Sequence, residues 1–198
     1  MKHIVWRPAL AGLIFCITLA LLGTSSPASI GPLGEAVNRM AIDPTDSNII
    51  YAATRSAGML KSTDGGTGWS VINNGLTDLD IGALGIARQD PNRLYLSTTI
   101  GVFRSTDAGA SWSGTGPISG QPFWAVAVAP NDPDTVYAGT TTSGLFKTTD
   151  GGANWVAISE GLTNRNMRSI IIHPQDVNTL YAGTNGGGVF KSTDAGAQ

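Results

Sequence analysis

One short segment of the sequence recurs at a fixed interval along the chain. Its first copy, residues 61–69, reads Lys-Ser-Thr-Asp-Gly-Gly-Thr-Gly-Trp, and variants of it return at residues 104–112 and 147–155. A fourth copy begins at Lys191 and is interrupted at Gln198. The four aspartates lie at positions 64, 107, 150 and 194, so the period is 43 or 44 residues. A period of this size is typical of repeat architectures and limits the fold more than any other feature.

Each repeat contains four short segments with the composition of β-strands, which we name A to D. Strand A alternates apolar and small residues, as in Met40-Ala-Ile42, and a turn rich in Pro, Asp and Asn follows it. Strand B contains a tyrosine at the same position in every copy: Tyr51, Tyr95, Tyr137 and Tyr181. Strand C precedes the repeated motif and strand D follows it. Four-stranded units with this period predict an all-β fold, a β-propeller of four-stranded antiparallel blades.

The repeated motif resembles the Asp-box, also called the bacterial neuraminidase repeat, with the pattern Ser/Thr-x-Asp-x-Gly-x-x-Trp. The matching residues are Ser62, Asp64, Gly66 and Trp69; Ser105, Asp107, Gly109 and Trp112; Thr148, Asp150, Gly152 and Trp155; and Ser192, Asp194 and Gly196 of the interrupted copy. The resemblance covers the chain from about residue 37 onward and implies about 3.75 blades of an Asp-box β-propeller. Such repeats occur in sialidases, xyloglucanase-type glycosidases, sortilin-type receptors and photosystem II assembly factors. The resemblance therefore implies a fold without selecting one function.

The repeated residues are expected to be structural. The Asp64 carboxylate is suited to accept backbone N–H bonds and close the turn between strands C and D. Gly66 is expected to supply a positive φ, and Trp69 to bury its ring between neighbouring blades. Four equivalent tyrosines likewise point to packing rather than to a nucleophile. One carboxylate per turn is a poor cage for calcium, which takes 6–8 oxygens, so we predict no metal or cofactor site.

Residues 1–28 have the features of a signal peptide. Lys2 and Arg7 precede an uncharged apolar run of about 14 residues, and small residues end the segment. This run is shorter than the roughly 20 residues that span a bilayer, and an uncleaved membrane anchor is the alternative. Residues 29–36 read as a linker, followed by blades at about 37–76, 81–120, 123–162 and, incomplete, 167–198. We expect a secreted or periplasmic protein.

The charge distribution excludes two classes of partner. Without Lys2 and Arg7, 10 basic and 14 acidic residues remain, and they are dispersed along the chain. No segment resembles a basic face for nucleic acid or a polybasic patch for membranes. A protein or a carbohydrate is the expected ligand.

Function is expected where the copies differ. On a propeller the D–A and B–C loops share one face, and the Asp-box turns lie on the opposite face with the A–B turns. The candidate ligand-binding residues in the first set of loops are Arg55, Gln121, Phe123, Trp124, Arg165 and Arg168. Trp124 and Arg168 share one position at the start of strand A with Asn38 and Gly82, where they could hold a sugar or peptide. Ordinary loop polarity, with Phe123 and Trp124 as packing residues, is the alternative.

Candidates for catalysis are few. A sialidase-like site would need an arginine triad and a Tyr–Glu pair, but beyond the predicted signal peptide the only glutamates are Glu35 and Glu160. A xyloglucanase-like inverting site needs two carboxylic acids about 6.5–9.5 Å apart. Asp78 or Asp80, paired with Glu160, are the weak candidates for such a pair.

Three functions follow from these observations. The leading hypothesis is an exported, non-catalytic binding or scaffold module for protein or glycan. One alternative is a glycoside hydrolase whose catalytic residues lie partly outside this sequence. The other is a protein similar to photosystem II assembly factors, with an arginine patch from Arg39, Arg55 and Arg168. Because the fourth repeat lacks its Trp and strand D, its strand C would have an open edge, and the natural protein is expected to continue beyond Gln198.

Overall fold

The computed structural model describes residues 35–116, 118 and 121–197. The predicted signal peptide and nearly all of the predicted linker lie outside this part of the chain. The described residues form only β-strands and the loops between them. No helix suited to crossing a bilayer occurs among them.

The strands form four antiparallel sheets, each built from consecutive segments of the chain. Blade 1 contains β1 (Val37–Ile42), β2 (Ile50–Thr54), β3 (Met59–Ser62) and β4 (Ser70–Val71). Blade 2 contains β5 (Ile81–Ile86), β6 (Leu94–Thr98), β7 (Val102–Ser105) and β8 (Ser113–Gly114). Blade 3 contains β9 (Phe123–Ala129), β10 (Asp132–Thr140), β11 (Leu145–Thr148) and β12 (Val156–Ala157). Blade 4 contains β13 (Met167–Ile172), β14 (Leu180–Thr184) and β15 (Val189–Ser192).

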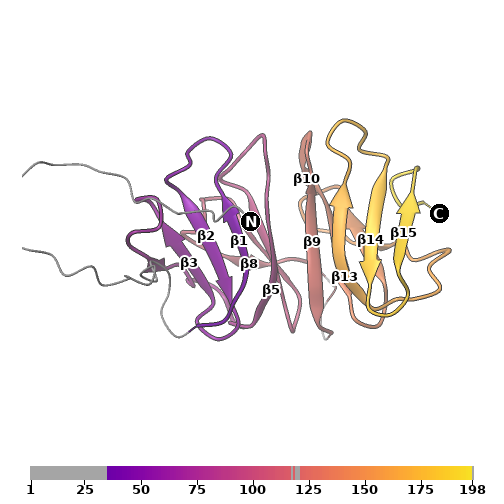
Figure 1. The fold of residues 1–198 in the computed structure, drawn as a ribbon, viewed down its shortest axis with the longest axis horizontal. Helices are drawn as coiled ribbons and strands as arrows, with labels where there is room; N and C mark the ends of the chain where they lie inside the picture. Colours follow the sequence, from indigo (N-terminus) through magenta and orange to yellow (C-terminus); the bar gives the residue numbers. More distant parts are fainter. Residues whose placement is uncertain (1–34, 117, 119–120, 198) are drawn as a thin grey trace, which may run out of the picture.

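The four blades stand side by side in sequence order (Figure 1). Within each blade the strands pair in the order in which they occur in the chain, as the sequence predicts. The first strands contact one another in succession, β1 with β5, β5 with β9 and β9 with β13. These strands therefore form the inner side of the assembly, which is the arrangement of a β-propeller.

The hydrophobic core is divided among the three interfaces between blades. In the first interface, Tyr51 and Met59 of blade 1 pack with Leu94, Phe103 and Trp112 of blade 2. Two further clusters join blades 2 and 3 and blades 3 and 4. Each blade therefore buries apolar side chains on the sheet faces that meet its neighbours, as close-packed sheets require.

The repeated tyrosines also join neighbouring blades through hydrogen bonds. Tyr51 Oη donates to the Ala108 carbonyl oxygen at 3.2 Å, and Lys61 Nζ donates to the same oxygen at 3.1 Å. Tyr137 and Lys147 make the equivalent bonds to Ala195, at 3.3 and 3.4 Å. Burial raises the pKa of Tyr51 to about 12, and the nearby carboxylate of Asp43 contributes to the same shift. Packing, as predicted, together with inter-blade bonding accounts for Tyr51 and Tyr137.

The Asp-box turns have the predicted chemistry. Asp64 Oδ1 accepts hydrogen bonds from the Ser62 hydroxyl and from the Gly68 amide, both at 2.8 Å. Gly66 has a φ of 92°, a conformation that side chains oppose. The residue before it also has a positive φ in every copy, and in two copies that residue is an alanine, Ala108 or Ala195.

The tryptophans differ in burial, which corrects one expectation. Trp112 is 5% exposed, packs against blade 1 and donates from Nε1 to the Ile72 carbonyl oxygen at 2.7 Å. Trp69 was expected to be buried between blades, but it is only half-buried and its Nε1 bonds to Gly66 within its own turn. No described blade precedes blade 1, whereas blade 1 itself provides the sheet on which Trp112 packs.

Candidate functional site

All four inner strands have an irregularity in register at the same place. The pairing of β1 with β2 shifts between Val37 and Arg39, which leaves Asn38 as the extra residue. The corresponding extra residues in the other three blades are Gly82, Trp124 and Arg168. A β-bulge of this kind redirects a side chain, and bulges are common beside functional sites. We call these four positions the bulge row.

The bulge row brings Trp124 and Arg168 together. Arg168 is exposed, and its guanidinium carbon lies 5.9 Å from the centroid of the half-buried Trp124 ring. A Cβ placed on Gly82 would be 3.1 Å from Cε3 of the same ring, so the indole covers the site where Gly82 has no side chain. At the first blade, Asn38 Nδ2 donates to the Ile81 carbonyl oxygen at 2.8 Å. Successive blades thus contact one another along the row.

The loops divide between two faces as predicted. On one face, the D–A connections meet the B–C loops, for example through Thr141 N donating to Pro122 O at 3.2 Å and Asn185 N donating to Asn166 O at 2.8 Å. On the other face, the A–B turns hold the Asp-box turns, as in Gly65 N donating to Asn48 O at 3.0 Å. The bulge row lies at the D–A end of the inner strands, on the first face.

Each D–A connection, like the segment before β1, is tied to the B–C loop of the following blade by a side chain 21 positions before its partner. Asp78 Oδ2 accepts from Thr99 N at 2.9 Å and from Thr99 Oγ1 at 2.5 Å. Gln121 Oε1 accepts from Thr142 Oγ1 at 2.9 Å. The remaining two pairs are Glu35 with Ser56 and Asn164 with Asn185. We call these pairs the loop clamps. The constant spacing can be read from the sequence, but the residue types differ from pair to pair, so it does not stand out as a motif.

The loop clamps give two predicted site residues a structural role. Burial alone would raise the pKa of Asp78, but hydrogen bonds from Thr99 and from the Asp80 amide outweigh it and lower the pKa below its usual value. Asp78 is therefore held as a carboxylate that accepts three bonds from protein groups. Gln121 uses its amide oxygen in the same way.

Arg55 and Asp80 lie together on the face formed by the D–A and B–C loops. Their Nε and Oδ2 atoms are 3.9 Å apart, a loose ion pair whose arginine side chain is 67% exposed. The second carboxylate oxygen of Asp80 is buried and has no hydrogen-bond partner among the described residues. The pair places both charge signs beside the bulge row.

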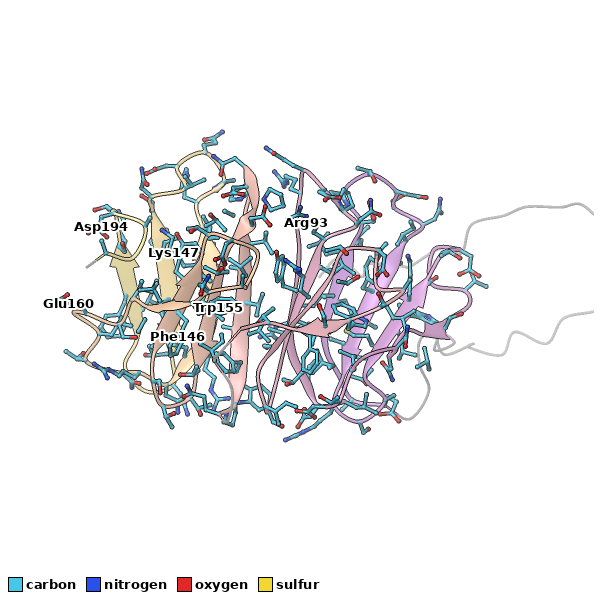
Figure 2. The ribbon with its side chains drawn as sticks, turned by 180° about the vertical axis from the view of Figure 1, so that it is seen from behind. Arg93, Phe146, Lys147, Trp155, Glu160 and Asp194 are labelled. Carbon is cyan, nitrogen blue, oxygen red and sulfur yellow. The ribbon has the colours of Figure 1, made fainter. Side chains whose placement is uncertain are left out.

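The other three candidates lie apart from this cluster. Phe123 is 1% exposed and packs with Phe146 and Val102 between blades, so its ring is not available at the surface. Arg165 is exposed in the last D–A connection. Glu160 is exposed at the end of the molecule formed by blade 4, where it lines a groove (Figure 2). The described residues show no contact that joins Glu160 to Asp78 or Asp80.

Metal binding finds no support in the described part of the chain, where no three His, Cys, Asp or Glu side chains come together. The Asp-box carboxylates are each occupied by their own turn. Backbone and side-chain hydrogen bonds from the turn lower the pKa of Asp107 and of Asp150 to about 2.

Comparisons with known proteins agree with the fold. No model of a known protein family matches the chain. A probable oligoxyloglucan-reducing end-specific xyloglucanase of Neosartorya fischeri is 31% identical over 111 residues, covering 51% of this chain and 13% of the relative. The crystal structure of an ancestral GH74 enzyme is 25% identical with a TM-score of 0.73, covering 83% of this chain and 23% of that chain.

A second group of similar structures consists of YCF48 structures. YCF48 bound to a D1 peptide is 19% identical with a TM-score of 0.60, covering 78% of this chain and 50% of that chain. This identity supports a shared fold alone. With three complete four-stranded blades and three strands of a fourth, the chain is an Asp-box β-propeller similar to those of GH74 xyloglucanases and YCF48.

Proposed function

We propose that this chain is an exported, non-catalytic binding module that holds a protein or glycan ligand at the bulge row. The observation that carries the proposal is the cation–π pair of Trp124 and Arg168 at equivalent bulges of successive blades. A partly exposed indole offers a flat apolar surface, and an arginine beside it offers several hydrogen-bond donors. This combination suits the face of a sugar ring as well as a peptide segment.

The contacts of the acidic residues favour binding over catalysis. Asp78 is engaged by Thr99, and Glu160 lies at the groove between blades 3 and 4. An inverting glycosidase would need two carboxyl groups facing each other across one substrate bond. Asp80 is paired with Arg55. Among the described residues, no contact joins Asp80 or Asp78 to Glu160.

The similar proteins support both ligand classes. The relatives at 31% identity are xyloglucanases, and one YCF48 structure contains a peptide. The chain spans only 13–15% of the length of those xyloglucanases. Their activity is therefore a second candidate function, with Asp78, Asp80 and Glu160 as its weak catalytic candidates. An assembly role like that suggested by the YCF48 likeness would involve Arg39, Arg55 and Arg168.

The proposal is tested by titrating the chain with xyloglucan oligosaccharides and, separately, with peptides, and recording binding by calorimetry. Trp124→Ala is expected to weaken binding by at least about tenfold, the loss typical of a central aromatic contact. Trp69→Ala is the matched control, because Trp69 belongs to an Asp-box turn on the opposite face. Equal loss in both variants would contradict the proposed site.

Catalysis is tested in parallel by measuring sugar release from xyloglucan. The binding module is expected to release none. Sugar release that Asp78→Ala or Glu160→Ala abolishes would favour the glycosidase instead. The assembly role would be opposed by unchanged partner binding after joint replacement of Arg39, Arg55 and Arg168.

A further inference from the structure

Two asparagine–glycine steps occur in the loops that form the face of the bulge row. Asn74 precedes Gly75 in the first D–A connection, and Asn185 precedes Gly186 in the B–C loop of blade 4. In such a step the backbone nitrogen of the glycine can attack the side-chain amide carbon of the asparagine, because glycine has no side chain to shield its nitrogen. The two atoms must first be brought together, so packing and hydrogen bonds decide whether the reaction proceeds. All four residues are exposed, and exposure alone does not separate the two steps.

The first step is held by the next blade. Trp112 N donates to the Asn74 carbonyl oxygen at 2.8 Å, and Asn74 Nδ2 donates to the Ala110 carbonyl oxygen at 3.4 Å. A Cβ on Gly75 would lie 2.1 Å from the Trp112 carbonyl oxygen, so the glycine is in close contact with the backbone of blade 2. Rotation that brings the Gly75 nitrogen onto the Asn74 amide would break these contacts, and the structure therefore opposes the attack.

The second step has none of these restraints. The side-chain amide of Asn185 makes no hydrogen bond with the described residues, and Gly186 N donates to none of them. A Cβ on Gly186 would meet nothing within 4 Å. Two more glycines follow at positions 187 and 188, so this stretch of the loop rotates with little steric resistance. The attacking nitrogen and the amide carbon are thus free to approach each other.

This loop position is exposed in other blades as well. Ser56 of blade 1 and Thr142 of blade 3 stand at the place of Gly186, two residues after the threonine that ends the second strand. Both are exposed, although each of these blades is followed by another blade. A neighbouring blade therefore leaves this part of the B–C loop open to solvent.

Two aspartate–glycine steps in the Asp-boxes could form the same ring, but their turns oppose it. The steps begin at Asp64 and Asp150, and both glycine nitrogens donate to a carbonyl oxygen of an A–B turn at 3.0 Å. Hydrogen bonds from the turn lower the pKa of Asp64 and hold that of Asp150 at about 2. Both side chains are therefore carboxylates, which are poor targets for a nucleophile. Among the four steps, the one at Asn185 is the step that the structure leaves free to react.

We propose that Asn185 is a site of spontaneous deamidation. The nitrogen of Gly186 forms a bond to Cγ of Asn185, and the Cγ–Nδ2 bond breaks. The proton of the Gly186 amide leaves with the amine as ammonia. Water then opens the five-membered succinimide at one of its two carbonyl carbons, and the product is aspartate or isoaspartate. Water is the only co-reactant, and no group is oxidised or reduced.

The modification would alter the loop clamp of blade 4. Asn185 N donates to the Asn166 carbonyl oxygen at 2.8 Å, and the Asn185 carbonyl oxygen accepts from Asn164 Nδ2 at 3.0 Å. Isoaspartate adds one backbone carbon between these two groups, so the two hydrogen bonds cannot both keep their geometry. Either product also adds a negative charge to the face that carries Arg168.

The test is incubation of the full chain at neutral pH, without any ligand. Mass spectrometry of its peptides locates each conversion of amide to acid, and enzymatic methylation labels isoaspartate. Asn185 is expected to convert at least about tenfold faster than Asn74 in the folded chain. In guanidinium, where the contacts of Trp112 are lost, the two steps are expected to react at similar rates.

Two variants isolate the chemistry. Asn185→Gln keeps an amide but would have to close a six-membered ring, so position 185 is expected to remain unmodified. Gly186→Ser introduces the residue that blade 1 has at this position, and its side chain is expected to slow the conversion at least about tenfold by shielding the nitrogen. Asn74→Gln is the matched control and should leave the rate at Asn185 unchanged.

Three outcomes would overturn the proposal. One is the absence of conversion at Asn185, and another is an equal or faster conversion at Asn74 in the folded chain. The third is a rate difference that persists in guanidinium, which would assign it to the local sequence instead of the fold. Because the reaction is recorded without a ligand, none of these outcomes depends on whether the bulge row binds one.

Discussion

Arg168 lies over the ring of Trp124 although the two residues belong to different blades, with 5.9 Å between the guanidinium carbon and the ring centroid. Both occupy the extra position of a bulge, 44 residues apart in the chain. The repeat therefore places two unlike side chains side by side because their backbones are equivalent. This relationship makes the neighbouring bulge residue, Gly82, a sensitive test of the site.

Gly82→Ala is expected to displace the Trp124 ring. The added Cβ would lie 2.7 Å from the Phe123 carbonyl oxygen and 3.1 Å from Trp124 Cε3, so the ring or the strand must move. The measurement is the indole N–H resonance of Trp124, assigned with Trp124→Phe, together with ligand affinity. Gly114→Ala is the control, because its Cβ would have 4.0 Å to the nearest atom. An unshifted Trp124 resonance in the Gly82 variant would show that the indole is not held there.

The loop clamp of Asp78 and Thr99 is expected to be energetically coupled. A double-mutant cycle with Asp78→Asn and Thr99→Val should give a coupling free energy of about 1–2 kcal/mol, because the bonds reach an ionised carboxylate. The same cycle at Gln121 and Thr142 should give about 0.5–1 kcal/mol, because both partners are neutral. Urea unfolding provides the four stabilities of each cycle. Additive effects of the two substitutions would show that the bond between the two side chains does not contribute measurably to stability.

Tyr137→Phe is expected to destabilise the chain by about 1 kcal/mol, the usual value of one net hydrogen bond. The hydroxyl of Tyr137 donates to the Ala195 carbonyl oxygen in the next blade. Tyr181 is the matched control, since no described blade follows blade 4 and no inter-blade carbonyl receives its hydroxyl. Thermal unfolding of Tyr137→Phe and Tyr181→Phe should therefore separate the two variants. Equal losses of stability in the two variants would show that the destabilisation does not come from the inter-blade hydrogen bond.

Stability is expected to fall in acid because of the Asp-box carboxylates. Asp107 and Asp150 have folded-state pKa values of about 2, below the value of about 3.9 in an unfolded chain. Their contribution is complete above about pH 4 and is lost as the pH falls through about 2. The urea midpoint measured from pH 5 to pH 2 should show this decline, and Asp107→Asn should make it shallower. A midpoint independent of pH in this range would refute the hydrogen-bonded turn.

Much of the fold was predictable because its determinants are local and repeated. The period and the strand composition predict the blades, and the Asp-box pattern predicts the bonds of Asp64 and the positive φ of Gly66. The left-handed conformation of Ala108 was not predictable from its identity, since alanine avoids that region. It follows from the equivalent glycines at positions 65 and 151.

The candidate site was less predictable because its residues act through neighbours that the repeat alone does not reveal. Phe123 and Trp124 are adjacent aromatic residues, yet the first is buried between blades and the second belongs to the bulge row, because strand residues alternate faces and a bulge intervenes. Glu160 is in a D–A connection, but it lines a groove between blades 3 and 4. Trp69 and Trp112 share a motif and differ in burial, since only one of them has a described blade to pack against.

The bulge row is a place where substitutions can change the ligand specificity of such a protein. Its four positions contain asparagine, glycine, tryptophan and arginine in otherwise similar strands, so the backbone accommodates chemically unrelated side chains there. Recognition can then be altered by exchanging one residue while the sheet pairing and the inter-blade cores stay as they are. A combinatorial library at Asn38, Trp124 and Arg168 would sample new specificities on a constant framework, provided that Gly82 is kept, because a Cβ there would lie 2.7 Å from the Phe123 carbonyl oxygen.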